Sequence, residues 1–166
     1  MSDATESMSL CELIEHIEET HHQFVRLNAP KIVELVNLLL KKHGHIEPNL
    51  KPLQLTVQAL VEEMMPHLMN EERILFPAIK AMEAGEKLDN SFGDIGNPIS
   101  NMEHEHKHSG ELLLKIRKLS NNYQAPEHAC ELWINCYQAL KEFDIDLQAH
   151  IAIENDELFS RTMQQS

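Results

Sequence analysis

The sequence has little glycine, few aromatic residues and few cysteines, and each shortage excludes a class of protein. Among its 166 residues are 5 Gly, and aromatic residues make up 5%. A turn-rich all-β fold normally needs more of both. The three cysteines, Cys11, Cys130 and Cys136, form no CxxC pair and leave one unpaired. We therefore expect no disulfide framework and a reducing, cytoplasmic setting.

Basic residues and long apolar runs are also scarce. The chain has 14 Lys and Arg against 27 Asp and Glu, a net charge of −13, which argues against binding to nucleic acid or an anionic membrane. No apolar run approaches the roughly 20 residues of a membrane-spanning helix. The start, MSDATESMS, lacks the basic and apolar regions of a signal peptide. Against these shortages, the 11 His stand out.

Proline, glycine and the spacing of apolar residues divide the chain into four helical stretches. We expect these at about 10–43, 52–85, 98–120 and 126–159, with residues 85–97 as the longest loop. Four long helices with short connections predict an all-α fold, an antiparallel up-down-up-down four-helix bundle. We assign this bundle to residues 10–163 and expect residues 1–9 to form a disordered tail.

A repeated motif points into the bundle. HLMNEERILF and HIAIENDELF both read His-x3-Glu-x3-Leu-Phe, and they place His67 with Glu71 and His150 with Glu154. Residues i and i+4 share one face of a helix, and the following Leu marks that face as buried. Burying an imidazole and a carboxylate is costly unless they pair or bind a metal. One copy fits a simple His–Glu hydrogen bond, whereas two copies favour a shared metal site.

The other two helices offer further histidines. Apolar spacing in the third helix favours His106 as the inward residue over His104 and His108, while spacing in the first does not choose between His21 and His22. Four His and two carboxylates are too many donors for one tetrahedral zinc ion. They suit two iron ions held by facing helices, although manganese or zinc can occupy such ligands.

A ferritin-like site is a weaker interpretation. Glu18-x-x-His21 and Glu103-x-x-His106 have the Glu-x-x-His spacing of ferritin-like metal sites. That interpretation leaves the His-x3-Glu repeat unexplained, so we rank it lower.

These motifs resemble those of the hemerythrin-like di-iron proteins, and specifically the repair-of-iron-centres (RIC) family. The matching segments are LIEHIEETHHQF, HLMNEERILFPAI, GNPISNMEHEHKHSGELL and HIAIENDELF, so the resemblance covers about Leu10 to Phe159. It implies two iron ions joined by an oxo or hydroxo bridge, with Glu71 and Glu154 bridging them. The metal ligands that it implies are His22, His67, Glu71, His106, His150 and Glu154.

Three departures accompany this resemblance. Oxygen-carrying hemerythrins have a further His where Gly110 stands and an Asp where Asn155 stands. RIC members carry a short Cys-containing N-terminal domain, whereas this chain begins almost at the bundle, so we expect that domain's function to be missing or supplied elsewhere. Pro66 precedes ligand His67 and should bend the helix by freeing the Glu62 carbonyl. Whether that bend aims the ligand or opens access, or is simply tolerated, stays open.

Several carboxylates are candidates for orienting the ligands, because a ligating His usually donates its other N–H to such a group. Three lie one turn upstream of a ligand: Glu18 before His22, Glu63 before His67 and Asp146 before His150. We favour Glu63 and Asp146 and expect Glu18 to be solvated. The resemblance also implies that Glu63 and Glu105 line an access path to the irons.

The resemblance implies a protein that repairs or protects iron centres, including iron–sulfur centres, damaged by nitrosative or oxidative stress. Donation of labile iron and reduction of nitric oxide at the di-iron site, which would make it an enzyme, both stay open. Expected partners are damaged iron–sulfur proteins or small gases, nitric oxide and dioxygen, with no nucleic acid or membrane. We expect a monomer or weak homodimer. The alternative is a hemerythrin-like binding protein for oxygen or redox sensing or iron storage.

Overall fold

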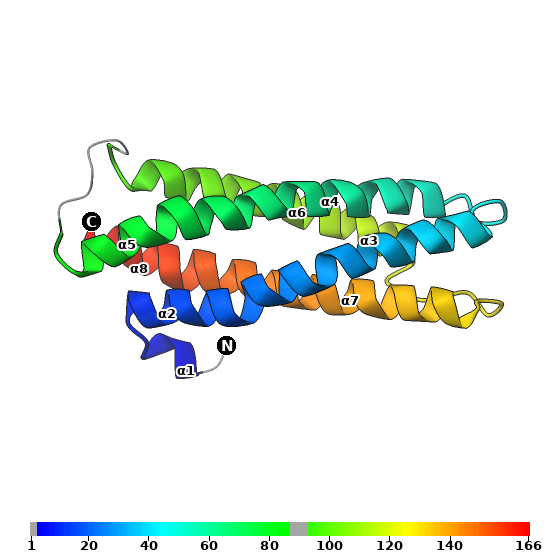
Figure 1. Ribbon diagram of the computed structural model, residues 1–166, viewed down its shortest axis with the longest axis horizontal. Coiled ribbons are helices and arrows are strands. Elements are labelled where there is room, and N and C mark those ends of the chain that lie inside the picture. Colours follow the sequence, from blue (N-terminus) through cyan, green and yellow to red (C-terminus); the bar gives the residue numbers. More distant parts are fainter. Residues whose placement is uncertain (1–2, 87–92) are drawn as a thin grey trace.

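The computed structural model describes residues 3–86 and 93–166, and these residues fold into an elongated bundle of long helices without a strand (Figure 1). The first long helix is α2 (Leu10–Ile17), η1 (Glu18–His22) and α3 (Gln23–His43) in succession. The second joins α4 (Leu50–Asn70), η2 (Glu71–Leu75) and α5 (Phe76–Glu83). The third is α6 (Gly96–Leu119), and the fourth joins α7 (Glu131–Ala152), η4 (Ile153–Phe159) and α8 (Ser160–Gln165).

The four long helices run antiparallel to their neighbours along the chain. Their connections lie at alternate ends of the bundle, and α3 packs against α4 and α7 while α6 packs against α4 and α7 (Figure 1). This arrangement confirms the predicted all-α bundle. Within the described ranges, no helix combines the length and apolarity needed to span a bilayer.

One helix boundary differs from the sequence expectation, and one predicted loop is described only in part. The fourth helix begins at Glu131, because residues 126–130 form a turn in which the Ala129 N–H donates to the Pro126 carbonyl at 2.9 Å. Cys130 then sits at the N-cap of α7. The predicted loop at 85–97 falls partly on residues 87–92, which lie outside the described residues.

Residues 3–9, which precede α2, are held against the end of the bundle, where the sequence predicts a disordered tail. It contains the short helix α1 (Asp3–Glu6). The Thr5 hydroxyl donates to Glu157 Oε1 at 2.8 Å, and Arg161 donates to the Met8 carbonyl at 2.6 Å. Ser9 and Glu12 form a capping box that starts α2. The structure differs from the prediction here because polar side chains of η4 and α8 bind this segment.

The buried apolar side chains form two clusters rather than one. The larger runs through α3, α4, α6 and α7 and includes Val25, Leu68 and Leu147. The smaller, which includes Ile17 and Leu158, joins α2 to η2, α5, η4 and the start of α6. Each long helix passes from one cluster to the other through a buried polar position, so a polar layer crosses the bundle between them.

Candidate metal centre

The polar layer consists of the six side chains that the sequence predicts as metal ligands. All six are at most 3% exposed, and every long helix supplies at least one of them. They are His22 at the end of η1, His67 in α4, Glu71 at the start of η2, His106 in α6, His150 in α7 and Glu154 in η4. The structure therefore brings the whole predicted set together.

Three of these residues lie in π-helical turns. His22 closes η1, Glu71 opens η2 and Glu154 is the second residue of η4. A π-helical turn is wider than an α-turn, and such turns occur frequently at functional sites. The three turns therefore mark the level of the polar layer in the first, second and fourth long helices.

One group of donor atoms lies between the first and fourth helices. Nε2 of His22 and Nε2 of His150 are 3.2 Å apart. Glu71 Oε2 lies 3.3 Å from His22 Nε2, and Glu154 Oε1 lies 2.9 Å from His150 Nε2. The ligand atoms of these four residues all lie within 4.8 Å of one another, an arrangement able to hold a metal ion.

A second group lies beside the first and uses the opposite oxygens of the same glutamates. Nε2 of His67 and Nε2 of His106 are 3.0 Å apart. Glu71 Oε1 lies 3.3 Å from His67 Nε2, and Glu154 Oε2 lies 3.1 Å from His106 Nε2. Each carboxylate thus presents one oxygen to each histidine pair, which is the arrangement required of a bridging ligand.

The hydrogen-bonding state of the two glutamates fits a metal pair. Both oxygens of Glu71 and Oε2 of Glu154 are buried, and none has a hydrogen-bond partner among the described residues. A buried carboxylate without partners is costly, whereas a cation beside it satisfies both its charge and its lone pairs. The residues present therefore fit a pair of metal ions: His22 and His150 would hold one, His67 and His106 the other, and the glutamates both.

The electrostatics of the layer couple imidazoles to carboxylates. Burial opposes protonation of His22 and His67. For His22, the contacts with Glu154 and Glu71 outweigh burial, and for His67 the contact with Glu71 does so. The pKa of His22 is raised to about 10 and that of His67 to about 9. Burial opposes ionisation of Glu154, yet the surrounding imidazoles, His150 and His106 foremost, lower its pKa well below its usual range. The carboxylates are therefore ionised, as bridging requires.

Three of the four histidines are fixed by a hydrogen bond at the outer ring nitrogen. Nδ1 of His22 lies 2.8 Å from Glu72 Oε1, Nδ1 of His67 lies 2.6 Å from Glu105 Oε2, and Nδ1 of His106 lies 2.8 Å from Asn155 Oδ1. These contacts leave Nε2 of each ring directed at the glutamates, because each outer nitrogen is held by its own acceptor.

These orienting partners differ from the ones favoured by sequence. Glu63 pairs with His108 at 2.7 Å instead of binding His67, because neighbouring α6 supplies Glu105 to that ring. Asp146 binds His21 at 2.9 Å. Glu18 lies near the surface, 4.0 Å from Lys80, as expected of a solvated group.

Two orienting residues, Glu72 and Asn155, were missed by sequence reasoning. Each directly follows a bridging glutamate, in the pairs Glu71-Glu72 and Glu154-Asn155. A polar residue at this place in both copies of the motif is the signal that was available. It could not identify the recipient ring, because that ring comes from a different helix in each case.

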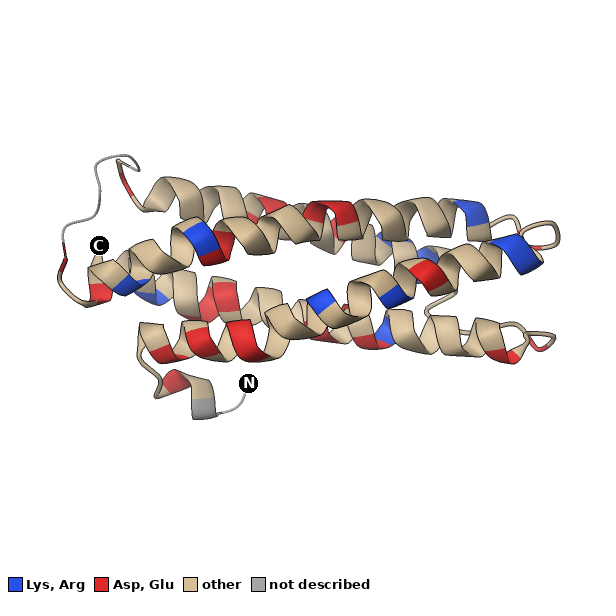
Figure 2. Ribbon diagram, in the orientation of Figure 1, with Lys and Arg blue, Asp and Glu red and all other residues tan. Residues whose placement is uncertain are grey.

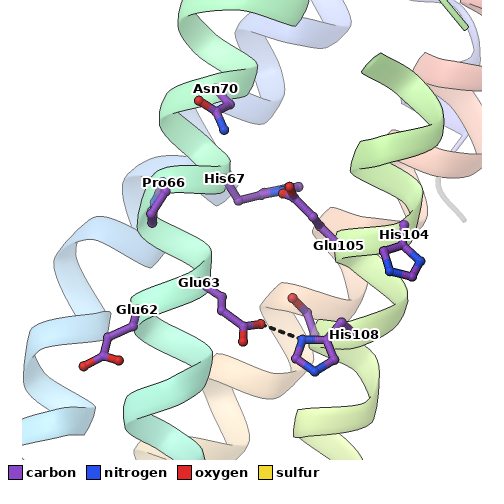
Figure 3. Close-up of a pocket in the computed structure, with 9 residues that line it drawn as sticks. Glu62, Glu63, Pro66, His67, Asn70, His104, Glu105 and His108 are labelled. Carbon is purple, nitrogen blue, oxygen red and sulfur yellow. Dashed lines mark hydrogen bonds and ion pairs between the residues drawn. The ribbon is translucent and has the colours of Figure 1, made fainter. Parts of the chain in front are cut away.

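A pocket of about 590 Å³ between α4 and α6 reaches the layer at His67 (Figure 3). Glu63 and Glu105 both line it, and the side chains of His67 and Glu105 point toward one another across it. Pro66 also lines this pocket. It lies inside α4, which continues as a helix on both sides of the proline. Access through this pocket stays a prediction, as does the effect of Pro66.

The charged residues on the outside are mostly acidic. Figure 2 shows Asp and Glu spread along the bundle, and the described part of the chain has no ribbon segment that is mainly Lys or Arg. This distribution agrees with the net charge of −13.

Fold and site together define a helical-bundle protein with a buried His and Glu centre for metal cations. A model of the hemerythrin HHE cation binding domain matches residues 12–162. The chain belongs to this hemerythrin family, within which it groups with the iron–sulfur cluster repair proteins. A domain that binds metal cations is thus confirmed.

Curated relatives share this grouping. The iron-sulfur cluster repair protein YtfE of Dickeya chrysanthemi (strain Ech1591) is 36% identical over 157 residues, covering 93% of this chain and 66% of the relative. The protein of the same name from Escherichia coli O1:K1 / APEC is 34% identical over 157 residues, covering 95% and 68%. That from Cronobacter sakazakii (strain ATCC BAA-894) is 34% identical over 154 residues, covering 93% and 66%. The chain therefore spans about two thirds of the length of these relatives.

Proposed function

We propose that this chain is a cytoplasmic di-iron protein that restores or protects iron–sulfur centres damaged by nitrosative or oxidative stress. One observation carries the proposal: two four-residue ligand groups share Glu71 and Glu154, each glutamate giving one oxygen to each group. The relatives named as iron–sulfur cluster repair proteins support the same conclusion. The expected partners are damaged iron–sulfur proteins, with nitric oxide or dioxygen as small ligands.

Imidazole and carboxylate donors in this number suit iron and leave coordination positions open. A bound pair of iron ions would supply electrons and open positions for a small ligand. The chain's own residues do the rest: the four Nε2 atoms and the two carboxylates hold the ions, while Glu72, Glu105 and Asn155 fix the ring orientations. The apolar clusters on both sides of the layer keep bulk water away from it.

The pocket between α4 and α6 favours iron donation as the use of this centre. It is lined by carboxylates and imidazoles, which attract a divalent cation, and it reaches His67 directly. The oxygen-carrier alternative is weaker, because those proteins have a further histidine at the place of Gly110, and glycine has no side-chain donor for a metal.

The test is anaerobic loading of the chain with ferrous iron, followed by metal analysis and transfer to a cluster-free iron–sulfur protein. We expect two irons per chain and recovery of the acceptor's cluster absorption when cysteine-derived sulfide is supplied. Retention of two irons by the double variant His67→Ala, His150→Ala would overturn the site. In parallel, nitrous oxide formation with turnover on nitric oxide titration would favour the reductase over the donor.

A further inference from the structure

His150 differs from the other three candidate ligands at its outer ring nitrogen. His22, His67 and His106 each place Nδ1 against a side-chain oxygen, whereas His150 Nδ1 is buried and has no hydrogen-bond partner among residues 3–86 and 93–166. A metal-ligating histidine almost always donates its second ring N–H to an acceptor. An acceptor for His150 is therefore needed.

Asp146 supplies the matching atom. It lies one turn before His150 on α7, so the two side chains are neighbours on the same helix face. Its Oδ2 is buried and also has no partner in the described part of the chain. Its other oxygen, Oδ1, accepts a hydrogen bond from His21 Nδ1 at 2.9 Å.

The ring of His21 completes the cluster. It stacks on His150 with the ring centroids 5.7 Å apart and the planes 9° from parallel. His21 therefore contacts both residues: it donates to the carboxylate of Asp146 and packs flat against the ring of His150. The side chains of His21 and Asp146 are only 11% and 21% exposed, so water competes weakly for these contacts.

His150 Nδ1 and Asp146 Oδ2 form neither a hydrogen bond nor an ion pair in the structure, so one of the two side chains must turn for these atoms to meet. His150 Nε2 lies 2.9 Å from Glu154 Oε1, and an ionised carboxylate only accepts, so Nε2 carries the proton. In a neutral ring Nδ1 is then an acceptor and cannot bond to the acceptor Oδ2 of Asp146. A ring that ligates through Nε2 carries its proton on Nδ1 and becomes a donor toward Oδ2.

We propose that Asp146, anchored by His21, is the positioning residue for ligand His150, accepting its Nδ1–H when Nε2 binds metal. His21 is thereby a positioning residue although its neighbour His22 is the ligand. This inference rests on the proposed metal centre. It gives each of the four ligand histidines one outer acceptor: Glu72, Glu105, Asn155 and Asp146.

The chain offers a matched control. Glu18 lies one turn before His22, as Asp146 does before His150, but its side chain lies near the surface, 4.0 Å from Lys80. Asp146→Asn keeps the side-chain shape but offers one acceptor oxygen instead of two. His21→Phe keeps a stacking ring without a donor, whereas His21→Asn restores an N–H close to the place of Nδ1.

The experiment titrates the metal-free full chain with zinc ion against a chromophoric chelator. For the wild type we expect two bound ions. Asp146→Asn and His21→Phe should weaken one of them about 10–100-fold and leave the other unchanged. His21→Asn should recover most of that affinity, and Glu18→Gln should bind both ions like the wild type. Long-range proton–nitrogen spectra of the zinc-loaded wild type should show His150 protonated at Nδ1.

The outcomes separate this inference from the proposed function. A wild type that binds no zinc would remove the metal centre and this inference with it. A wild type that binds two ions, with Asp146→Asn and His21→Phe binding both equally well, would overturn the positioning role and leave the centre in place. An equal loss of both ions, or a loss that His21→Asn does not relieve, would indicate a merely structural effect and also contradict the proposal. If Asp146→Asn fails to fold, the two His21 variants decide.

Discussion

Asn155 Oδ1 lies 2.8 Å from Nδ1 of His106, a residue of the neighbouring helix α6. Glu72 occupies the same place after the other bridging glutamate and binds His22 Nδ1 at the same distance, 2.8 Å. Each His-x3-Glu segment therefore supplies a ligand, a bridge and, one residue later, the orienting acceptor for a histidine on another helix. The two segments act as equivalent halves of one centre.

This equivalence predicts that each orienting residue affects the affinity for a different metal ion. Asn155→Ala should weaken the ion held by His67 and His106, and Glu72→Ala the ion held by His22 and His150, each by about 10–100-fold, because the ring loses its fixed tautomer. Competition with a chromophoric chelator measures both affinities. Asn70→Ala, just before the bridging Glu71, is the matched control and should change neither. Loss of the same ion in both variants would contradict the two-group arrangement.

Substitution of a bridging glutamate should remove more iron than substitution of a histidine that belongs to one ligand group. Glu71 faces both histidine pairs, at 3.3 Å from His22 and 3.3 Å from His67, whereas His106 belongs to one group. We expect Glu71→Ala to lose both irons and His106→Ala to retain about one, as measured by metal analysis after anaerobic loading and desalting. One retained iron in the Glu71 variant, with normal folding by circular dichroism, would argue against bridging.

The pKa shifts predict how metal binding depends on pH. The pKa of His22 is raised to about 10 and that of His67 to about 9, so both rings are protonated at pH 7 without metal. A metal ion binds only the neutral ring, so binding must release these protons. Affinity for ferrous or zinc ion should therefore rise steadily from pH 6 to pH 9. Calorimetry in buffers of different ionisation enthalpy should detect the released protons, and a pH-independent affinity would contradict this.

The metal-free protein should show the opposite trend in stability. Raised histidine pKa values stabilise the fold fully below the ordinary value of 6.5, and this contribution is lost as pH rises through 9 to 10. The lowered pKa values of Glu71 and Glu154 stabilise it above 4.5, and this contribution is lost at lower pH. Urea unfolding of the metal-free chain should therefore give its highest midpoint between pH 4.5 and 6.5. A midpoint that rises from pH 6.5 to pH 9 would contradict this coupling.

Sequence reasoning predicted the fold and placed most of the side chains that meet in the polar layer. The His-x3-Glu repeat placed His67, Glu71, His150 and Glu154 on inward faces, because a helix puts i and i+4 together irrespective of its partners. Spacing alone left His21 and His22 unresolved, and the structure separates them: His22 enters the polar layer, while His21 binds Asp146. The π-helical turn at the end of the first segment shifts the register there, which a 3.6-residue period does not anticipate.

The orienting contacts were predicted less well, for a physical reason. The carboxylate one turn upstream was the natural candidate, but the outer nitrogens of His22 and His67 are bound by Glu72 and Glu105, which come from neighbouring helices. Contacts between helices depend on their relative rotation, which one sequence does not determine. Within a single helix the prediction stays open, since Asp146 lies one turn before His150 on α7 but binds His21.

A buried ion pair far from the polar layer ties α6 to α7 and should dominate the stability of that end. Asp144 is 2% exposed and accepts two hydrogen bonds from Arg117, at 2.6 Å each, and others from Tyr123 and Gln148. Tyr123 closes a turn whose three residues have φ between 50° and 62°, a left-handed stretch that is strained without glycine. The Tyr123 hydroxyl bond to Asp144 helps to hold this turn.

Asp144→Ala should therefore destabilise the chain by about 1–3 kcal/mol, because it leaves the Tyr123 hydroxyl and the partly exposed Arg117 guanidinium without their acceptor. Urea unfolding of the metal-free chain measures this loss. Glu142→Gln is the control on the same helix: its side chain is exposed and contacts Gln138, so its substitution should change the free energy of unfolding by less than about 0.5 kcal/mol. Zinc affinity in Asp144→Ala should stay close to wild type, since the pair lies outside both ligand groups. An unchanged unfolding midpoint would show that the turn and the α6–α7 packing hold without this carboxylate.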